Sequence, residues 1–240
     1  MQCLYHLEVS GKLKFGTNVN VSLNSASVAV IIPVSGSSNL FRKSLESVLN
    51  ETDEVEEIII ILNGADSSLK RLIPVTQNKI QLIEIESALG ASQARNIGAS
   101  IAESQFLRFL DADDQLIRGS SQEMIKLIKK KESEVVFGKI RVNDIRTGSS
   151  RETATAVPAV GSTLLHRSIF EHLGGFDTSL KMGEFIDLFV RIRKNGFTER
   201  KLDSVVLERN LHDENYSNKN LKTESIHYLR ILRNRLNSEK

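Results

Sequence analysis

The chain has 240 residues, 40% of them hydrophobic, which suits one α/β domain with short extensions. Lys and Arg number 32 against 30 Asp and Glu, so the formal net charge of +2 gives no strong positive field, and we expect no nucleic-acid partner. The single Cys3 excludes an intramolecular disulfide, and no apolar run reaches the roughly 20 residues of a spanning helix, so we expect a cytoplasmic protein without a transmembrane segment.

Residues 1–26 precede the first clear strand pattern. Apolar residues alternate with polar ones at Leu13 and Phe15 and again from Val19 to Leu23, and Gly-Thr-Asn lies between the two runs. Alternation on both sides of a turn is typical of two paired strands. We therefore interpret this stretch as an N-terminal extension that forms a short β-hairpin.

Strand patterns then alternate with helix patterns. The predicted strands are continuous apolar runs at 28–34, 55–62, 80–86 and 105–110. Each is followed by apolar residues at helical spacing, at 36–50, 67–73, 92–104 and 120–131. Four successive β-then-α units predict an α/β fold with a mostly parallel central sheet flanked by helices.

The second half of the chain mixes strands and helices less regularly. A strand is predicted at 134–142, a helix at 183–197 and a further strand at 201–208, with a polar loop after the first of these. Residues 213–240 include apolar residues near one helical face and arginines elsewhere, which predicts an amphipathic C-terminal helix. This helix either docks on the domain or serves a membrane surface or a partner, and we favour docking.

Three carboxylates follow the strand at 105–110. Asp111, Asp113 and Asp114 stand at the carboxyl end of that strand, where ligands bind in open parallel sheets. Two carboxylates two residues apart in a turn can share a divalent cation. An EF-hand loop is excluded, since Leu116 and Gln122 replace the required Gly and Glu. The alternative of a helix cap with solvated acids stays open.

Six segments together resemble the inverting GT-A glycosyltransferases of the family 2 type, which use sugar nucleotides as donors. The segments occur in the family's order and are VAVIIPV (28–34), LNGADSS (62–68), GASQARNIGAS (90–100), FLDADD (109–114), GSTLLHRSIFEHLGGFDTSL (161–180) and GEFIDLFVRIRKNG (183–196). FLDADD resembles the family's DxD motif. The resemblance covers about 27–212, and it implies a GT-A domain with a nucleotide-sugar half at 27–115 and a smaller, mixed acceptor half at 116–212.

The resemblance implies roles for several residues at the donor site. Asp113 would ligate Mn²⁺ or Mg²⁺, and Asp111 would contact the ribose and help hold the metal. Arg95 would contact the nucleotide or its phosphates, with a surface ion pair as the structural alternative. Pro33 and Val34 would border the base through their backbone, unless they simply end a strand.

The donor loop departs from the family pattern. Paired aspartates are usual after the second strand, whereas here Asn63 follows Leu62, and Asp66 comes three residues later. Asn63 can donate and accept hydrogen bonds and so read a base edge, although LNGAD is also good turn chemistry. A UDP-sugar is the expected donor, and another nucleotide stays open.

The catalytic base departs further. Inverting displacement needs a carboxylate that takes the acceptor hydroxyl's proton, and the family usually supplies it from Glu-Asp at a helix start. Here the pair is Glu184 and Phe185, so we expect Glu184 to be the base, with Asp187 as the other candidate. First-turn acids are also favoured by the helix dipole alone.

Two residues resemble the Arg-x-x-His motif found at the end of the domain in many family members. Arg209 would contact phosphate, and His212 would complete the metal or diphosphate site. His166 has a weaker claim, in the acceptor cleft. The resemblance thus implies metal-dependent, inverting transfer of a sugar to a hydroxyl-bearing acceptor. The alternative is a catalytically degenerate GT-A-like binding or scaffold protein; a nucleotidyltransferase is disfavoured because its glycine-rich phosphate loop is missing.

Overall fold

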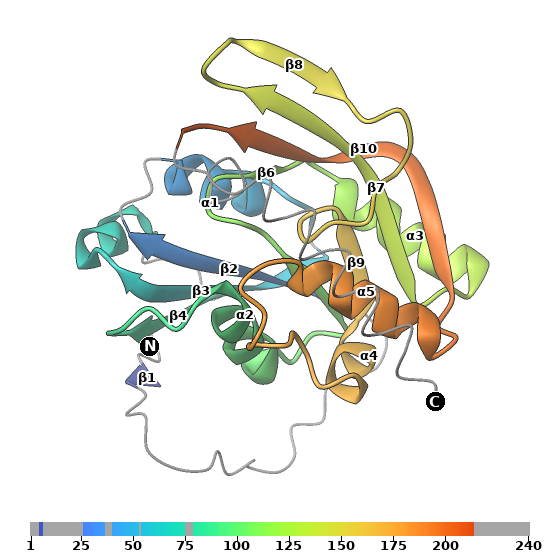
Figure 1. The fold of residues 1–240 in the computed structure, drawn as a ribbon, viewed down its shortest axis with the longest axis horizontal. Coiled ribbons are helices and arrows are strands. Elements are labelled where there is room, and N and C mark those ends of the chain that lie inside the picture. Colours follow the sequence, from blue (N-terminus) through green and yellow to red (C-terminus); the bar gives the residue numbers. More distant parts are fainter. Residues whose placement is uncertain (1–4, 7–25, 37–39, 53, 75–78, 214–240) are drawn as a thin grey trace.

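The computed structural model describes residues 5–6, 26–36, 40–52, 54–74 and 79–213. Ten strands form one sheet in the order β1-β4-β3-β2-β5-β9-β7-β10-β6, with β8 paired to β7 (Figure 1). The strands are β1 (Tyr5–His6), β2 (Val28–Gly36), β3 (Val55–Ala65), β4 (Ile80–Ile85), β5 (Phe106–Phe109), β6 (Gln115–Leu116), β7 (Val135–Asp144), β8 (Ser149–Glu152), β9 (Thr163–His166) and β10 (Glu199–Leu211). The helices are α1 (Phe41–Leu49), α2 (Ala91–Ile101), α3 (Ser120–Lys131), α4 (Arg167–His172) and α5 (Glu184–Lys194), with a 3₁₀ helix, η1, at Ser67–Leu72.

The sheet is mostly parallel, as predicted. Strands β4, β3, β2 and β5 are mutually parallel, and β7 pairs in parallel with β10. Strand β9 lies between β5 and β7 and runs antiparallel to both. The carboxyl ends of the parallel strands therefore share one edge of the sheet, where the loop after β5 emerges.

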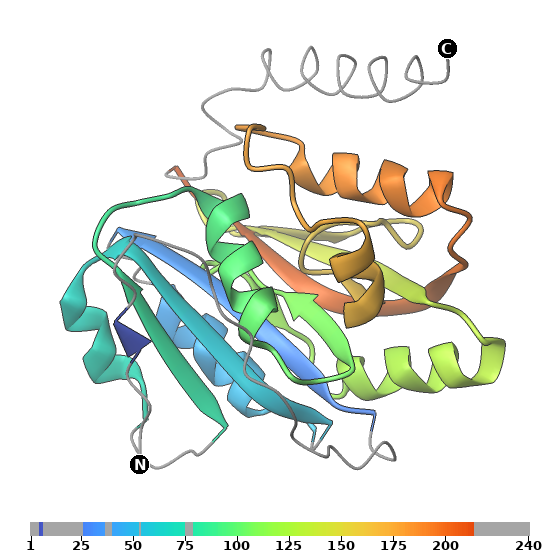
Figure 2. The same cartoon turned by 90° about the horizontal axis from the view of Figure 1, so that it is seen from below.

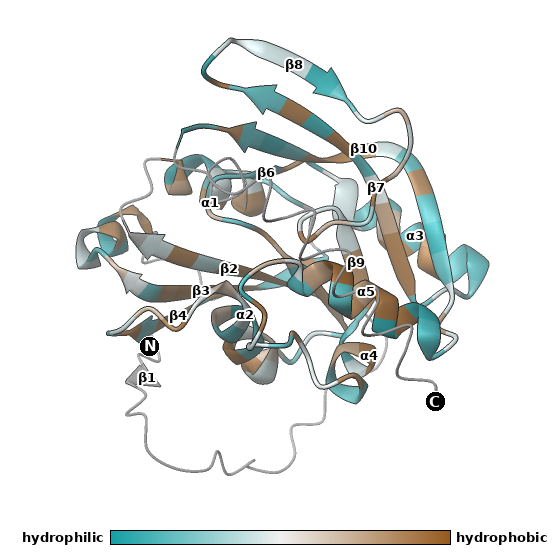
Figure 3. Ribbon diagram, viewed as in Figure 1, coloured by the Kyte–Doolittle hydropathy of each residue, from teal (hydrophilic) through white to brown (hydrophobic). Residues whose placement is uncertain are grey.

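Helices cover both faces of the sheet (Figure 2). Helices α1, η1 and α3 pack on one face, and α2, α4 and α5 pack on the other. Along β2, alternate residues enter the two cores: Val30 and Ile32 face the first, and Ala29 and Ile31 face the second. Burial on both faces explains why this strand is a continuous apolar run. The β8 strand, by contrast, is exposed and polar (Figure 3).

The 3₁₀ helix η1 replaces the α-helix predicted at 67–73. Asp66 caps it by accepting a hydrogen bond from Ser68 N, and Ile73 after it is already extended, with φ −89° and ψ 118°. Ile73 precedes Pro74, and a proline disfavours the helical conformation of the residue before it. The segment therefore has room for only a short 3₁₀ helix.

Other differences lie at the ends and in the second half. The predicted N-terminal hairpin, with alternation at Leu13 and Phe15 and from Val19 to Leu23, lies outside the described residues. Of residues 1–25 the structure describes only Tyr5–His6, whose backbone pairs in parallel with β4. The rest of that stretch and the predicted terminal helix lie outside the described residues. Strands β6, β8 and β9 and helix α4 were not predicted. No helix in the described part of the chain is long and apolar enough to cross a membrane.

Candidate active site

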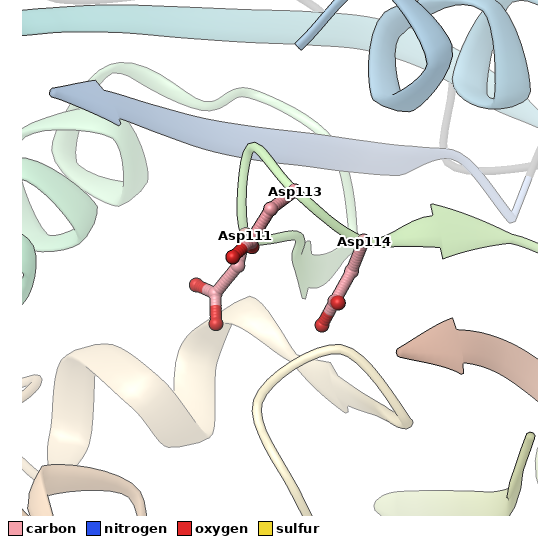
Figure 4. A group of neighbouring side chains, drawn as sticks. All are labelled: Asp111, Asp113 and Asp114. Atoms are coloured by element: carbon pink, nitrogen blue, oxygen red, sulfur yellow. The ribbon is translucent and has the colours of Figure 1, made fainter. Parts of the chain in front are cut away.

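An acid cluster, defined here as Asp111, Asp113 and Asp114, occupies the turn after β5. One carboxylate oxygen from each residue lies within 4.8 Å of the others (Figure 4). Helix α1 supports this turn: Ser44 Oγ donates to Asp111 O at 3.3 Å, and Ser47 Oγ accepts from Leu116 N at 3.0 Å. The strand's end and the neighbouring helix together bring the three acids to the edge of the sheet.

The acid cluster concentrates negative charge in a partly buried place. Burial raises the pKa of Asp113, and the neighbouring Asp111 charge raises it further. Burial also raises the pKa of Asp114 well above its ordinary value, with Asp111 and Asp113 adding to the effect. Carboxylate oxygens are hard donors that suit Mn²⁺ or Mg²⁺, and a cation here would relieve the repulsion. The residues present therefore fit a divalent metal.

The end of β10 closes over the acid cluster. His212 Nε2 lies 2.9 Å from Asp113 Oδ2. Asn210 donates twice: its backbone N to Asp114 Oδ1 at 3.0 Å, and its Nδ2 to Asp113 O at 2.6 Å. Arg209 is exposed beside them. The structure thus brings the predicted His212 to the predicted Asp113, and it adds Asn210, which the sequence analysis missed. No local pattern marks Asn210, because its partners lie 96 and 97 positions away in the sequence.

Arg95 links the acid cluster to α5. Its side chain is 4% exposed, with Nη2 2.5 Å from Asp111 Oδ1 and Nη1 2.9 Å from Glu184 Oε1. Burial lowers the pKa of Arg95, but the Asp111 and Glu184 charges outweigh burial, and the net direction is upward. A residue predicted for the donor side and a residue predicted as the base are therefore partners of one arginine.

Glu184 and Asp187 have different surroundings, although both lie in the first turn of α5. Glu184 faces Arg95, whereas Asp187 is 1% exposed and pairs with Arg191, whose Nε lies 2.8 Å from its Oδ2. Arg191 also donates to Leu173 O and Gly175 O, each at 2.7 Å. The Asp187 carboxylate thus helps to hold the loop after α4, and this geometry favours Glu184 as the group available to an acceptor.

Phe185 occupies the position at which the family usually has an aspartate. Its side chain is buried among the apolar residues under α5. Its ring stacks on Phe189, with ring centroids 6.1 Å apart. A buried phenyl ring cannot take a proton, so any base on this helix must be another residue.

The predicted base-reading residues both bond to other parts of the protein: Asn63 to the segment before α2, and Asp66 to η1. Asn63 is buried, its Oδ1 accepts from Leu89 N at 2.8 Å, and its Nδ2 donates to Gly90 O at 3.2 Å. Asp66 caps η1, and hydrogen bonds from Ser68 lower its pKa. The Asp66 contact matches the turn alternative, whereas Asn63 bonds to residues 26 and 27 positions away. Recognition of a nucleobase by Asn63 or Asp66 stays a prediction.

Two further residues lie near the end of β2, and one predicted residue lies far from the site. Pro33 and Val34 pair with β3; Pro33 is partly exposed, whereas Val34 is fully buried. His166 instead packs on Phe106, with ring centroids 4.4 Å apart. Phe106 begins β5, at the opposite end from the acid cluster, which contradicts an acceptor-cleft role for His166.

The mostly parallel sheet with an acid cluster after β5 is the arrangement of a GT-A nucleotide-diphospho-sugar transferase fold. The profile described as Glycosyl transferase family 2 matches residues 29–207, and the chain belongs to this family.

Curated relatives match parts of the chain. The minor teichoic acid biosynthesis protein GgaA of Bacillus subtilis (strain 168) is 38% identical over 108 residues, which is 40% of this chain and 23% of GgaA. The Escherichia coli UDP-Glc:alpha-D-GlcNAc-diphosphoundecaprenol beta-1,3-glucosyltransferase WfgD is 26% identical over 116 residues, 48% of this chain and 46% of WfgD. The chain spans less than half the length of these relatives: 16% of an uncharacterized glycosyltransferase of Rickettsia bellii (strain RML369-C), 38% of the glycosyltransferase GlyG of Streptococcus pneumoniae serotype 4 and 23% of GgaA.

Solved structures support the same fold. The crystal structure of S. aureus TarS 1-349 in complex with UDP-GlcNAc superposes with a TM-score of 0.69 at 15% identity, covering 80% of this chain and 60% of that chain. This likeness, at low identity, concerns the fold alone.

Proposed function

We propose that the protein transfers one sugar from a nucleotide-sugar donor to a hydroxyl group of an acceptor, by a metal-dependent single displacement that inverts the anomeric carbon. The observation that carries this proposal is the joining of the acid cluster to Glu184 through Arg95. Membership of Glycosyl transferase family 2 supports it. The binding of UDP-GlcNAc by TarS supports a UDP-sugar as donor.

On the donor side, Asp113 and His212 would hold Mn²⁺ or Mg²⁺, with Asp111 helping to hold the metal and contacting the ribose. The bound cation would neutralise charge that develops on the departing diphosphate. Arg209 is exposed next to the acid cluster, where its fixed charge would meet a phosphate. The backbone of Pro33 and Val34 would border the base.

On the acceptor side, Glu184 would act as the general base. The acceptor hydroxyl oxygen attacks the anomeric carbon, the bond from that carbon to the diphosphate oxygen breaks, and the hydroxyl proton passes to the Glu184 carboxylate. The products are the glycosylated acceptor and a nucleoside diphosphate. Arg95 orients Glu184 through the contact at 2.9 Å.

Donor hydrolysis tests the proposal. UDP-, GDP- and dTDP-sugars are incubated with Mn²⁺ and the wild type, Asp113→Ala, Glu184→Gln or Asp187→Asn, and released nucleoside diphosphate is measured. We expect one donor to be hydrolysed, with a loss of about a hundredfold or more in Asp113→Ala and in Glu184→Gln. Asp187→Asn is the matched carboxylate control. If Asp187→Asn loses activity while folded and Glu184→Gln keeps it, the assignment of the base is wrong.

A second function remains because of one observation, the burial of Phe185 where the family usually has an aspartate. The alternative is a GT-A-like binding or scaffold protein. It predicts that calorimetry detects binding of a nucleotide sugar while no donor is hydrolysed. The cytoplasmic location, the identity of the sugar and the division into donor and acceptor halves stay predictions.

A further inference from the structure

Arg95 makes two parts of the site depend on each other. Its Nη2 contacts Asp111, and its Nη1 contacts Glu184, at 2.5 and 2.9 Å. Both nitrogens belong to one planar guanidinium. A change in the charge or position of one carboxylate therefore changes how strongly the guanidinium interacts with the other carboxylate. The proposed metal site and the proposed base are therefore not independent groups.

The surroundings of Arg95 fix the direction of its guanidinium. The Phe176 ring centroid lies 5.6 Å from the guanidinium carbon. Asn96, the next residue on α2, holds the Phe176 backbone through two hydrogen bonds of 2.9 Å, donating from Nδ2 to Phe176 O and accepting at Oδ1 from Phe176 N. Within the described part of the chain, Arg95 Nε is buried without a hydrogen-bond partner. Compensation of the buried charge thus depends on Asp111 and Glu184.

We propose that Arg95 is a positioning residue that couples cation binding at the acid cluster to Glu184, an inference that rests on the proposed function. Loss of the Glu184 charge would leave Arg95 paired with Asp111 alone, and the guanidinium would then compete more strongly with a cation for that carboxylate. Conversely, a cation on Asp111 leaves more of the Arg95 charge to Glu184. Linkage makes the two effects equal in free energy.

A cycle of variants measures this coupling without any sugar donor. The wild type, Glu184→Gln, Arg95→Met and the double variant are titrated with Mn²⁺, and the electron paramagnetic resonance signal of the free ion is followed. We expect Glu184→Gln to weaken Mn²⁺ binding about fivefold or more. In the Arg95→Met background, the same change should have no more effect than the control Glu171→Gln. Glu171 is an exposed carboxylate that pairs with Arg167 on α4, at 2.7 Å.

Two results would overturn the coupling. One is an equal loss of Mn²⁺ affinity on removing Glu184 with and without Arg95, which would mean that Glu184 acts through its field alone. The other is unchanged binding in Glu184→Gln. If Arg95→Met does not fold by circular dichroism, Arg95→Lys replaces it in the cycle. A lysine keeps the charge but cannot span two carboxylates, so the coupling must again fall.

Donor hydrolysis by the same proteins separates this inference from the proposed function. A wild type that hydrolyses a donor but shows no coupling refutes the coupling alone. A wild type that shows the coupling but hydrolyses no donor refutes the transferase function alone. A wild type that binds no Mn²⁺ overturns the coupling together with the metal dependence.

Discussion

Asp113 and His212 are separated by 99 positions in the sequence, and Oδ2 of the first lies 2.9 Å from Nε2 of the second. The contact forms because β10 runs parallel to β7 and ends at the same edge of the sheet as β5. The residues just after β10 therefore reach the turn that carries the acid cluster. A metal site that used both residues would require β5, β9, β7 and β10 to be folded first.

The first prediction concerns His212. We expect His212→Ala to weaken Mn²⁺ binding about 10- to 100-fold, since loss of a ligand or of its supporting contact has effects of this size. Calorimetric titration with Mn²⁺ measures it. His172→Ala is the control, because His172 is exposed on α4 and packs against Phe197, with ring centroids 5.9 Å apart. Equal affinities in the two variants would remove His212 from the site.

The second prediction concerns pH. Because the pKa values of Asp113 and Asp114 are raised, protons compete with a cation at a higher pH than for ordinary carboxylates. We expect Mn²⁺ affinity to fall as the pH is lowered from 7 towards 5, and the Asp114→Asn variant to show a shallower fall. Titration of Mn²⁺ at several pH values measures the slope. A pH-independent affinity would contradict the prediction.

The third prediction concerns stability in the absence of metal. A carboxyl with a raised pKa in the folded state binds protons more tightly than in the unfolded state, so its effect on the free energy of unfolding becomes more unfavourable as the pH rises from the ordinary Asp value through the raised one. Asp114→Asn should therefore raise the Tm at pH 7, by about 2–4 °C for each kcal/mol gained, and should not raise it near pH 4. Thermal unfolding at both pH values tests the sign. A Tm gain that is the same at both would contradict it.

The fourth prediction concerns a buried ion pair on the face of the sheet that α1 and α3 cover. Arg108 and Glu51 are both fully buried, with Nη1 and Oε1 3.3 Å apart, and burial lowers the pKa of Arg108 to about 10. The Glu51 carboxylate also accepts from Gly119 N at 2.5 Å and Ser121 N at 3.1 Å, so it caps the start of α3 from outside that helix. Glu51→Gln would leave the Arg108 charge uncompensated.

We expect Glu51→Gln to lower the free energy of unfolding by about 3–5 kcal/mol. The control Glu46→Gln removes a partner of Arg42 from an exposed i,i+4 pair and should cost less than about 1 kcal/mol. Urea denaturation compares the two variants. Similar losses would show that burial does not set the cost.

The fifth prediction concerns the packing of α2, which carries Arg95. A Cβ atom added at Gly98 would lie 2.5 Å from Ile31 Cγ2, too close for an ordinary contact. We expect Gly98→Ala to destabilise the fold by about 1–3 kcal/mol. The control Ser100→Ala, an exposed change on the same helix, should stay within about 0.5 kcal/mol. Urea denaturation measures both, and an unchanged Gly98→Ala variant would show that α2 can move away from β2 at little cost.

Local periodicity predicted most of the parallel half of the fold. The helix predicted at 120–131 begins and ends where α3 does, and the four apolar runs correspond to β2, β3, β4 and β5. These patterns arise because the buried positions of a single helix or strand are apolar, and the spacing of apolar residues can be seen directly in the sequence. The short β9 was not predicted, because four residues carry too little pattern and its partners β5 and β7 are distant in sequence.

The candidate site was predictable in its residue types and less so in its partners. The sequence identified the acid cluster and His212. It did not identify Asn210 or the hydrogen bonds between Asn96 and the Phe176 backbone, since nothing local marks an amide that bonds to a distant part of the chain. For Asp187 a signal existed: Arg191 lies four residues later on the same helix face, the spacing of an ion pair.

The reversed direction of β9 has a consequence for the acceptor side of the proposed function. Since β9 is antiparallel to β5, its first residues lie beside the end of β5, where Leu164 is in register with Arg108. The loop at 153–162, which precedes β9, is thereby delivered to the edge that bears the acid cluster. In the proposed function, the exposed residues of this loop would face the acceptor. Changes in them would then alter acceptor choice, while the strands that place Asp111 and Asp113 stay the same.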